Sequence, residues 1–415
     1  MTLRSYQDQI ANDAVKLLKA YGIAYLSMQV RTGKTITSLT AAARYGAKEI
    51  LFVTKKKAIS SILSDHTHIE GESVLAVVNY EQLHNYDRNP DVIICDEAHC
   101  LGAFPKPSVR TKRLKEICKN KPVIFLSGTP TPESYSQIYH QLYVSSFSPF
   151  KEYKNFYQWA NAGYVNIRKK YLHGMSINDY KQANKHMIDK ETKHLFISYT
   201  QEQAGFKTEV EDEIIPVKMQ PSTYYLADKL RKDRVFTGKN GNVILADTEV
   251  KLMNKLHQIY SGTVIDESGD GVAFDNTKIK LIQDLFRNKK IAIFYKFKAE
   301  ESQLIWAYGY DKLTTDPEVF NQSTDKVFIS QIQSGREGIN LSTADALVML
   351  NIDFSAVSYI QARNRLMSKE RTSQAKVYWI FAEGGIEQEI YAKVQDKQDF
   401  TLSYFTQWNQ RSNQK

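Results

Sequence analysis

Short apolar runs alternate with stretches of helical apolar spacing in two parts of the chain. In the first part these runs lie within residues 24–35, 48–59, 73–83, 91–99 and 122–134. In the last part they lie within residues 291–297, 326–332, 346–352 and 376–382. Strands that alternate with helices are typical of a parallel sheet covered by helices. The pattern therefore predicts an α/β protein with two parallel-sheet domains in tandem.

The alternation stops between these two parts, and the interruption indicates the domain boundaries. We expect a first domain at residues 1–145, a helical insertion or linker at 146–215, and a second domain at 216–415. The pattern at 384–400 predicts an amphipathic helix that packs against the second domain. A length of 415 residues, of which 42% are hydrophobic, suits two or three domains with buried cores.

The first apolar run ends in a turn suited to binding phosphate. Gly33, Lys34 and Thr35 stand where a strand gives way to a helical pattern, so N–H groups and the helix dipole would face an anion. Lys34 would reach the β and γ phosphates of a nucleotide, and Thr35 would hold Mg²⁺. Met28 replaces the first glycine of the usual Gly-x-x-x-x-Gly-Lys-[Ser/Thr] pattern, so an ordinary strand-to-helix turn is the alternative. The predicted binding loop comprises Arg31, Thr32, Gly33, Lys34 and Thr35.

Two carboxylates, Asp96 and Glu97, follow the β-branched run within residues 91–99. The carboxyl ends of parallel strands are where ligands bind in open α/β sheets, so these side chains should lie near Lys34. Asp96 would hold Mg²⁺ through water, and Glu97 would orient or deprotonate the attacking water. The alternative is a solvated acidic turn. The sequence therefore predicts an ATP·Mg²⁺ site with Lys34, Asp96 and Glu97 as catalytic residues.

Charge and cysteine content narrow the choice of partners and compartment. The net charge of +9 favours a polyanionic partner, although a basic balance also fits a soluble surface. The three cysteines have no metal-ligand spacing, so we expect reduced thiols rather than a zinc site or disulfides. The chain shows neither a signal peptide nor an apolar run long enough to span a membrane. These features predict a cytoplasmic protein without a membrane partner.

The Gly-Lys-Thr turn followed by Asp-Glu-Ala-His resembles the superfamily-two helicases and translocases of the DEAD/DEAH-box and Swi/Snf kind. The resemblance implies two tandem RecA-like domains with ATP in the cleft between them and nucleic acid across both. It also implies that Gln7 reads the adenine edge; a solvent-facing glutamine is the alternative. The motif Ser127-Gly128-Thr129-Pro130 resembles the segment that couples the ATP and nucleic-acid sites. The predicted coupling residues are His99, Ser127, Thr129 and Gln361.

The second domain resembles the same family in two motifs. Residues 331–355 match a glycine-bounded loop, in which Gly338 would contact the nucleotide. In the next motif Arg365 follows Gln361 at a helical spacing, and Arg365 is the predicted arginine finger. The family usually places a second arginine three residues later, where this chain has Ser368. Either Lys369 or Arg371 substitutes, or the finger is weakened.

Two regions are predicted to contact nucleic acid. The first region follows the strands of the first domain, where members of the family contact the nucleic-acid backbone. It comprises Lys55, Lys56, Lys57, Asn79 and Tyr80. The second is the middle segment, where aromatic residues interleave with Arg168, Lys169 and Lys170. A solvated charged face and a structural aromatic core are the alternatives for these regions.

The resemblance implies an ATP-dependent DNA helicase or translocase. The compact size suggests a bacteriophage enzyme in the host cytoplasm, acting as a monomer in DNA replication or recombination beside other proteins of those pathways. DNA is favoured over RNA, although an RNA helicase stays open. Two further alternatives are an ATP-gated nucleic-acid clamp with little turnover and the motor of a restriction system, for which no nuclease carboxylate cluster is visible.

Overall fold

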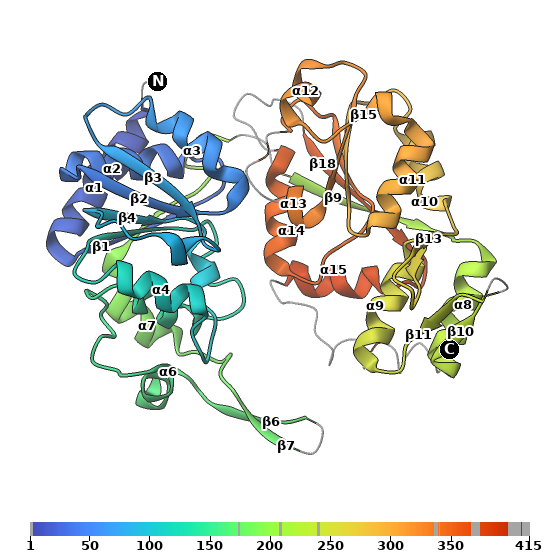
Figure 1. The fold of residues 1–415 in the computed structure, drawn as a ribbon, viewed down its shortest axis with the longest axis horizontal. Coiled ribbons are helices and arrows are strands. Elements are labelled where there is room, and N and C mark those ends of the chain that lie inside the picture. The colour runs from blue at the N-terminus through green and yellow to red at the C-terminus, as the bar shows by residue number, and fades with distance from the viewer. Residues whose placement is uncertain are drawn as a thin grey trace. The chain divides into compact units, whose positions relative to one another are not determined.

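The computed structural model describes residues 3–172, 175–206, 210–238, 241–335, 339, 341–366, 374–396 and 408. The chain divides into two compact units, Met1–Gly205 and Phe206–Lys415. Each unit contains a six-stranded sheet in which neighbouring strands are parallel (Figure 1). The predicted α/β class with two parallel-sheet domains is therefore confirmed. The division falls at one point, whereas the sequence analysis set boundaries at 145 and 216.

The sheet of the first unit has the strand order β3-β2-β4-β5-β1-β8. Its strands are β1 Ile23–Met28, β2 Glu49–Thr54, β3 Val74–Asn79, β4 Val92–Cys95, β5 Val123–Leu126 and β8 Phe196–Tyr199. All of these except β8 coincide with the apolar runs that predicted them. Residues of β4 and β5 are buried throughout, as expected for parallel strands covered on both faces.

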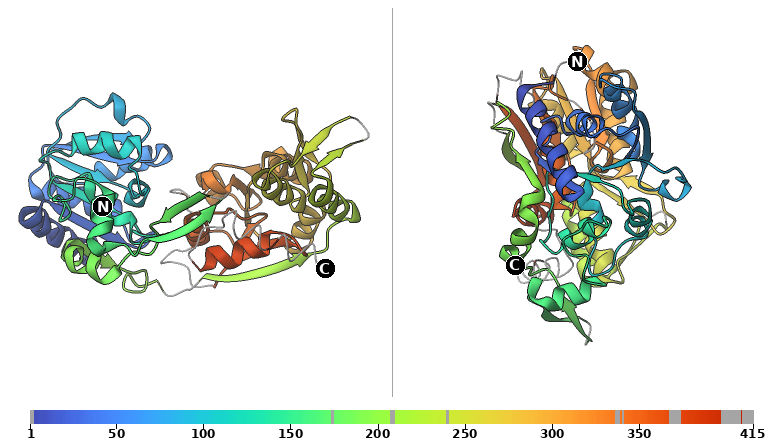
Figure 2. Two further views of the ribbon diagram at one scale, coloured as in Figure 1. Left: turned by 90° about the horizontal axis from the view of Figure 1, so that it is seen from below. Right: turned by 90° about the vertical axis from the view of Figure 1, so that its left-hand side faces the viewer.

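Helices cover both faces of this sheet (Figures 1 and 2). Alternate side chains of β1 point to opposite cores, because successive residues of a strand face opposite sides. One core contains residues of α1 Ser5–Tyr21, α2 Lys34–Tyr45 and α3 Ile59–His66. The other contains residues of α4 Val109–Ile117, α5 Gln137–Tyr143, α6 Phe156–Trp159 and α7 Lys185–Thr192.

The segment after α5 contains more than the helices that the sequence analysis expected. The π-helix Ala160–Tyr164 follows α6, and an antiparallel hairpin of β6 Arg168–Leu172 and β7 Met175–Asp179 comes next. After α7 and the 3₁₀ turn Lys193–Leu195, β8 returns to pair with β1. The segment therefore completes the first sheet at its edge.

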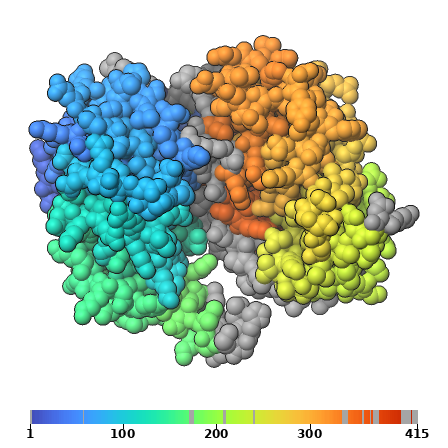
Figure 3. Space-filling model, in the orientation of Figure 1, coloured from blue at the N-terminus to red at the C-terminus, as the bar shows by residue number. Residues whose placement is uncertain are grey.

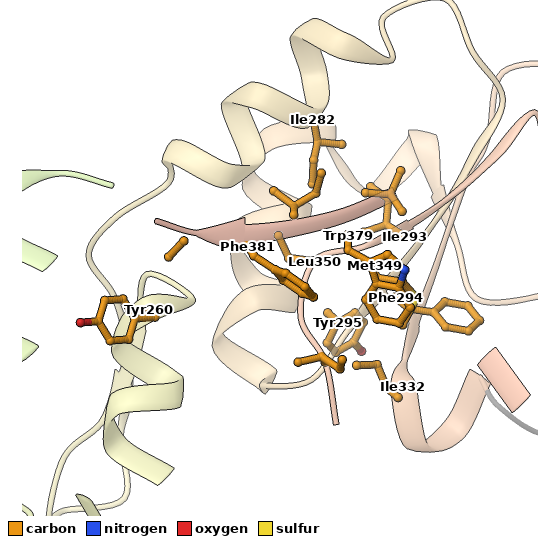
Figure 4. Close-up of a cluster of buried hydrophobic side chains, with 14 of the residues drawn as sticks. Tyr260, Ile282, Ile293, Phe294, Tyr295, Ile332, Met349, Leu350, Trp379 and Phe381 are labelled. Atoms are coloured by element: carbon orange, nitrogen blue, oxygen red, sulfur yellow. The ribbon is translucent and has the colours of Figure 1, made fainter. Parts of the chain in front are cut away.

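The sheet of the second unit has the order β15-β16-β14-β17-β18-β9. Its strands are β9 Val210–Val217, β14 Ile291–Tyr295, β15 Leu313–Thr314, β16 Val327–Gln331, β17 Ala346–Met349 and β18 Ala375–Ala382. The four runs predicted as strands are confirmed as β14, β16, β17 and β18. The apolar side chains that these strands turn inward build the core drawn in Figure 4.

The remaining elements of the second unit surround this sheet. Its helices are α8 Pro221–Asp233, α9 Glu249–Tyr260, α10 Thr277–Leu285, α11 Lys298–Tyr308, α12 Pro317–Gln322, α13 Ile332–Gly335, α14 Ala356–Arg363 and α15 Glu387–Gln395. Two small hairpins pair β10 Val235–Thr237 with β11 Val243–Leu245 and β12 Thr263–Ile265 with β13 Gly271–Ala273. Helix α15 confirms the amphipathic helix expected within 384–400. Across the described ranges, no helix has both the length and the apolar character needed to cross a membrane.

Candidate nucleotide site

Three neighbouring strands of the first unit end at the same edge of the sheet. The order β4-β5-β1 brings together the turn after β4, the loop after β5 and the loop between β1 and α2. Because ligands bind at the carboxyl ends of parallel strands, this edge is the candidate site. It carries Lys34, Asp96 and Ser127 on three different connections.

The loop between β1 and α2 has an unusual backbone. Gly33 caps α2 with a φ of 84°, and Arg31 also has a positive φ of 63°. A Cβ atom on Gly33 would come within 2.0 Å of the Nε2 atom of Gln7, so only glycine fits there. The positive φ of Arg31 costs conformational energy in a residue with a side chain. The loop thus holds a strained turn at the N-terminus of a helix, the geometry that suits an anion.

Lys34 rests on the loop that precedes it. Its Nζ donates hydrogen bonds to the carbonyl oxygens of Met28, at 3.0 Å, and Gln29, at 3.3 Å. A phosphate would be a stronger partner than either carbonyl oxygen, because an anionic acceptor adds a charge–charge attraction to the hydrogen bond. Thr35 is half-buried in the first turn of α2, beside Lys34.

Asp96 is held in place from two sides. Its Oδ2 accepts a hydrogen bond from Thr54 Oγ1 at 2.8 Å, and its carbonyl oxygen accepts one from Tyr80 Oη at 2.6 Å. Burial raises the pKa of Asp96 to about 6, and the charge of Glu97 adds to this effect, whereas Thr54 and Lys34 oppose it. A divalent cation would favour the ionised carboxylate.

The donor chemistry of the site fits Mg²⁺. This ion is usually bound by one or two protein oxygens together with phosphates and water. Asp96 and Thr35 offer a carboxylate and a hydroxyl, as the sequence analysis predicted. No group of three or more His, Cys, Asp or Glu side chains within the described part of the chain could hold a metal on its own.

The predicted coupling residues of the first unit meet next to Glu97. Glu97 has a φ of 48°, and its Oε2 lies 3.3 Å from Nδ1 of His99. The same ring nitrogen lies 3.1 Å from Oγ of Ser127, which also accepts a hydrogen bond from the backbone N–H of Thr129 at 3.2 Å. The structure thus brings Glu97, His99, Ser127 and Thr129 into one chain of polar contacts. Their functional roles stay predictions.

Gln7 contacts the binding loop itself. Its Oε1 accepts from the backbone N–H of Arg4 at 2.9 Å, and its Nε2 donates to the carbonyl oxygen of Thr32 at 3.4 Å. Tyr6 donates to the same carbonyl oxygen at 3.0 Å. In this arrangement Gln7 supports the loop from the side of α1, and its predicted contact with adenine stays a prediction.

Sequence reasoning missed the support that the loop receives from the end of the first unit. The side-chain amide of Gln201 donates to the carbonyl oxygen of Val30 at 3.1 Å, and its backbone N–H donates to Oε1 of Gln29 at 2.7 Å. Tyr199 stacks on Tyr6, with ring centroids 4.5 Å apart. These residues follow β8, a strand that the sequence analysis did not foresee, so no signal in the sequence connected them with the loop.

The residues predicted to grip nucleic acid near the first sheet differ in exposure. Lys55 is half-buried and Lys56 is exposed, while the side chain of Lys57 lies outside the described residues. Asn79 and Tyr80 are only 4% and 2% exposed, and Tyr80 supports Asp96 as described above. Their predicted contact with nucleic acid stays a prediction that would require these two side chains to become accessible.

In the second segment with predicted nucleic-acid contacts, the three basic residues lie on one strand. Arg168 and Lys169 are exposed on β6, and Lys170 occupies the next position of the same strand, although its side chain lies outside the described residues. The segment is a hairpin, whereas the sequence analysis expected a helix. The alternative of a structural core holds for several aromatic residues of this segment, because Phe156, Trp159 and Tyr164 are buried in the first unit. Contact of Arg168, Lys169 and Lys170 with nucleic acid stays a prediction.

The motif residues of the second unit lie at the end of α14. Gln361 and Arg365 are 5% and 9% exposed. Helix α14 ends at Arg363, and Arg365 lies in the 3₁₀ turn Asn364–Leu366 that follows it, so the two residues stand on successive helical elements. The single face expected from their spacing stays a prediction. Arg363 instead pairs with Asp212 of β9 at 2.7 Å. Gly338 lies outside the described residues, and so do Ser368, Lys369 and Arg371.

Comparison with known proteins gives partial matches. No model of a known protein family matches the chain. A stretch of 83 residues is 31% identical to the chromatin structure-remodeling complex subunit snf21 of Schizosaccharomyces pombe, covering 20% of this chain and 7% of that protein. A stretch of 129 residues is 30% identical to the chromatin-remodeling ATPase INO80 of Cryptococcus neoformans var. neoformans, covering 30% of this chain and 7% of that protein.

The same ATPase from a second strain of that fungus matches over 129 residues at the same identity. The matched stretches thus span a small fraction of these relatives, 7% or less of their length. The similarity is distant, but each match is to a remodelling protein, and two of them are named as ATPases. The partial matches therefore show that parts of this chain are similar to chromatin-remodelling proteins.

Proposed function

We propose that this protein is an ATP-dependent DNA translocase or helicase. The observation that supports it best is the convergence of Lys34, Asp96 and Glu97 on one sheet edge, with Glu97 linked to Ser127 through His99. Each connection supplies a different part of the chemistry of phosphoryl transfer. The similarity to remodelling ATPases supports the same reaction class.

The proposed chemistry divides among a few residues. Lys34 leaves the carbonyl oxygens of Met28 and Gln29 to contact the β and γ phosphates. Thr35 and Asp96 hold Mg²⁺, which offsets charge on the phosphates. Glu97 orients the attacking water and accepts its proton. Arg365 of the second unit supplies a guanidinium that stabilises the transferring phosphoryl group.

DNA is the proposed track. The relatives are named as chromatin-remodelling proteins, and chromatin contains DNA. The exposed Arg168 and Lys169 offer cations for backbone phosphates. The relatives come from fungi, so they give no support to the bacteriophage origin expected from the compact size. Replication or recombination partners and a monomeric state remain part of the proposal without support from the comparisons.

The test is the steady-state ATPase rate without nucleic acid and with single-stranded DNA, duplex DNA, forked DNA or RNA. The Lys34→Ala protein serves as the control for contaminating ATPases. We expect strong stimulation by DNA and a weaker response to RNA. Stimulation by RNA alone would make the protein an RNA helicase, and equal basal rates in the Lys34→Ala and unsubstituted proteins would contradict the proposal.

A clamp that turns over ATP slowly is the second candidate. The strained Arg31 in the binding loop favours it, because a loop that departs from the glycine pattern can bind a nucleotide without being optimal for hydrolysis. A near-zero rate with every polymer, together with tight ATP-dependent binding of DNA, would favour the clamp. Processive turnover stimulated by DNA would exclude it.

A further inference from the structure

The hairpin β6–β7 has few contacts that could hold it by itself. Residues of both strands are exposed, including Ile177, which is 46% exposed. Two-stranded hairpins are marginally stable alone, so this one depends on its base for a fixed position. Figures 1 and 3 show the segment standing out from the body of the first unit. Its surroundings are basic: residues 165–183 contain four Lys/Arg residues and one carboxylate.

Two buried serines fix the base of the hairpin. The hydroxyl of Ser134 donates to the carbonyl oxygen of Lys181 at 2.6 Å, and the hydroxyl of Ser136 donates to that of Tyr180, also at 2.6 Å. Ser134 is 7% exposed and Ser136 is fully buried. Lys181 and Tyr180 directly follow β7, so the two hydrogen bonds clamp the strand where it leaves the hairpin.

Both serines belong to the loop that begins at the nucleotide site. The loop, residues 127–136, starts with Ser127, which contacts His99 next to Glu97. Helix α5 fixes the position of this loop, because the side-chain amide of Gln141 donates a hydrogen bond to the carbonyl oxygen of Pro130 at 2.7 Å. Further along, the side-chain oxygen of Gln137 accepts from the backbone N–H of Glu133 at 3.1 Å. One tethered loop therefore connects Glu97 to the base of the basic hairpin.

We infer that the hairpin is a DNA contact whose engagement is transmitted through loop 127–136 to Glu97. The inference rests on the proposed function and adds a sensing element to it. Binding of a DNA backbone phosphate to Arg168 and Lys169 would shift the position of β7. The two serine hydrogen bonds would transmit this shift to the loop. Ser134 and Ser136 are thus positioning residues that act through Ser127 and His99. DNA would accelerate hydrolysis by aligning Glu97.

The decisive variant is the double substitution Ser134→Ala and Ser136→Ala. We expect the DNA-dependent increase in kcat to shrink about fivefold, the size typical of couplings of this kind. The Kd for a fluorescent DNA oligonucleotide should change by less than about twofold, because neither serine is part of the charged surface. Ser302→Ala, an exposed serine on α11, is the matched control and should preserve the full increase. Ser134→Thr, which keeps the hydroxyl, should restore most of the coupling when Ser136 is intact.

A second variant tests the contact itself. Arg168→Glu with Lys169→Glu should weaken DNA binding about tenfold and lower its salt slope, because phosphate contacts release counterions. Lys16→Glu with Lys19→Glu changes the net charge equally on α1 and should have a smaller effect. Thermal unfolding of every variant shows whether the first unit still folds.

The outcomes separate this inference from the proposed function. If the folded double serine variant is still fully stimulated by DNA, the proposed transmission is wrong. If the variant loses DNA affinity together with stimulation, the serines only support the binding surface, and the proposed transmission is again wrong. Unchanged DNA affinity and salt slope after charge reversal would overturn the hairpin contact. If DNA fails to stimulate the unsubstituted protein, the proposed function fails first, and the inference falls with it.

Discussion

The two units have the same sheet architecture, but they use the edge at the carboxyl ends of their strands differently. In the first unit Lys34 rests on backbone carbonyl oxygens. In the second unit Lys296, which follows β14, forms an ion pair with Asp353 at 2.6 Å, with both side chains largely buried. The charge of Lys296 is therefore matched by a carboxylate beside it, while the charge of Lys34 also acts on Asp96 and lowers the pKa of that carboxyl.

Neighbouring polar groups of the second unit also contact one another. The side chain of Asn351, next to β17, donates to Oε1 of Glu300 at 2.8 Å, and its own oxygen lies 2.5 Å from Nε2 of His257. A buried polar network of this kind can stabilise a fold. Similar sheets thus carry the candidate nucleotide site in one unit and a buried polar network in the other, in line with the rule that function depends on the site and not on the fold.

The largest effect is expected from a substitution at the candidate nucleotide site. Lys34→Ala should lower ATP turnover by about 1000-fold, roughly 4 kcal/mol at the transition state, because the charge that meets the phosphates is lost. The melting temperature should stay close to that of the unsubstituted protein, because the hydrogen bonds from Lys34 to Met28 and Gln29 connect parts of one loop. Steady-state kinetics and thermal unfolding measure the two properties. A Lys19→Ala protein is the control, and normal turnover in Lys34→Ala would remove the central claim.

Glu97→Gln should have the next largest effect. A glutamine keeps the shape of the side chain but cannot accept a proton from water, so kcat should fall about 100-fold. ATP binding should be retained, which a nucleotide titration under single-turnover conditions would measure. An unchanged kcat would mean that the water is activated by another group.

A substitution at Lys296 in the second unit should lower the stability of the protein. Lys296→Met leaves Asp353 without its cation and should lower the free energy of unfolding by about 2 kcal/mol at neutral pH. Burial opposes ionisation of Asp353, but Lys296, followed by hydrogen bonds, holds its pKa below 3.8 in the folded protein. The stabilisation is therefore present above pH 3.8 and is lost as the pH falls through the lower folded value.

The difference in free energy of unfolding between the Lys296→Met and unsubstituted proteins should consequently narrow as the pH falls below about 4. Protonation then removes the charge of Asp353 that the variant leaves unpaired. Denaturant unfolding at pH 7 and at about pH 3 measures this. Nucleotide binding by the first unit should persist in the variant. A stability gap that stays constant with pH would show that packing, and not the ion pair, is responsible.

The smallest expected effect concerns the support of the binding loop. Gln201→Ala removes the hydrogen bond to the carbonyl oxygen of Val30 and should weaken ATP binding by about 1 kcal/mol, roughly fivefold. Gln203 lies in the same turn and bonds to Thr200, so Gln203→Ala is the matched control. Equal affinities in the two variants would show that Gln201 does not position the loop.

Much of the fold followed from the sequence, because buried parallel strands are continuous apolar runs. Strand β9 was missed because VEDEIIPV contains three consecutive acidic residues and a proline. It lies at the edge of its sheet, where proline and charged side chains are tolerated, and Glu213 faces Lys376 of β18 at 3.5 Å. The pattern of an edge strand therefore resembled that of a loop.

The site was predictable where a motif lies within one connection, and less so where it depends on distant segments. Lys34, Asp96 and Glu97 follow strands that the apolar runs identified, so their shared edge could be inferred. The inward orientation of Tyr80 toward the carbonyl oxygen of Asp96 depends on how β3 and β4 flank β2, which the sequence does not specify. The link from Gln201 to the loop requires β8 to pair with β1, across more than 160 residues of chain.

That late pairing has a consequence for the order of synthesis. Strand β1 is made early, but its outer neighbour β8 is completed only after residue 199 has left the ribosome. Until then β1 would present an unpaired edge, and edges of this kind invite pairing with other chains. A fragment that ends at residue 145 would keep this edge permanently and should aggregate. During translation, protection of the nascent first unit by a chaperone would matter most in the interval between β1 and β8.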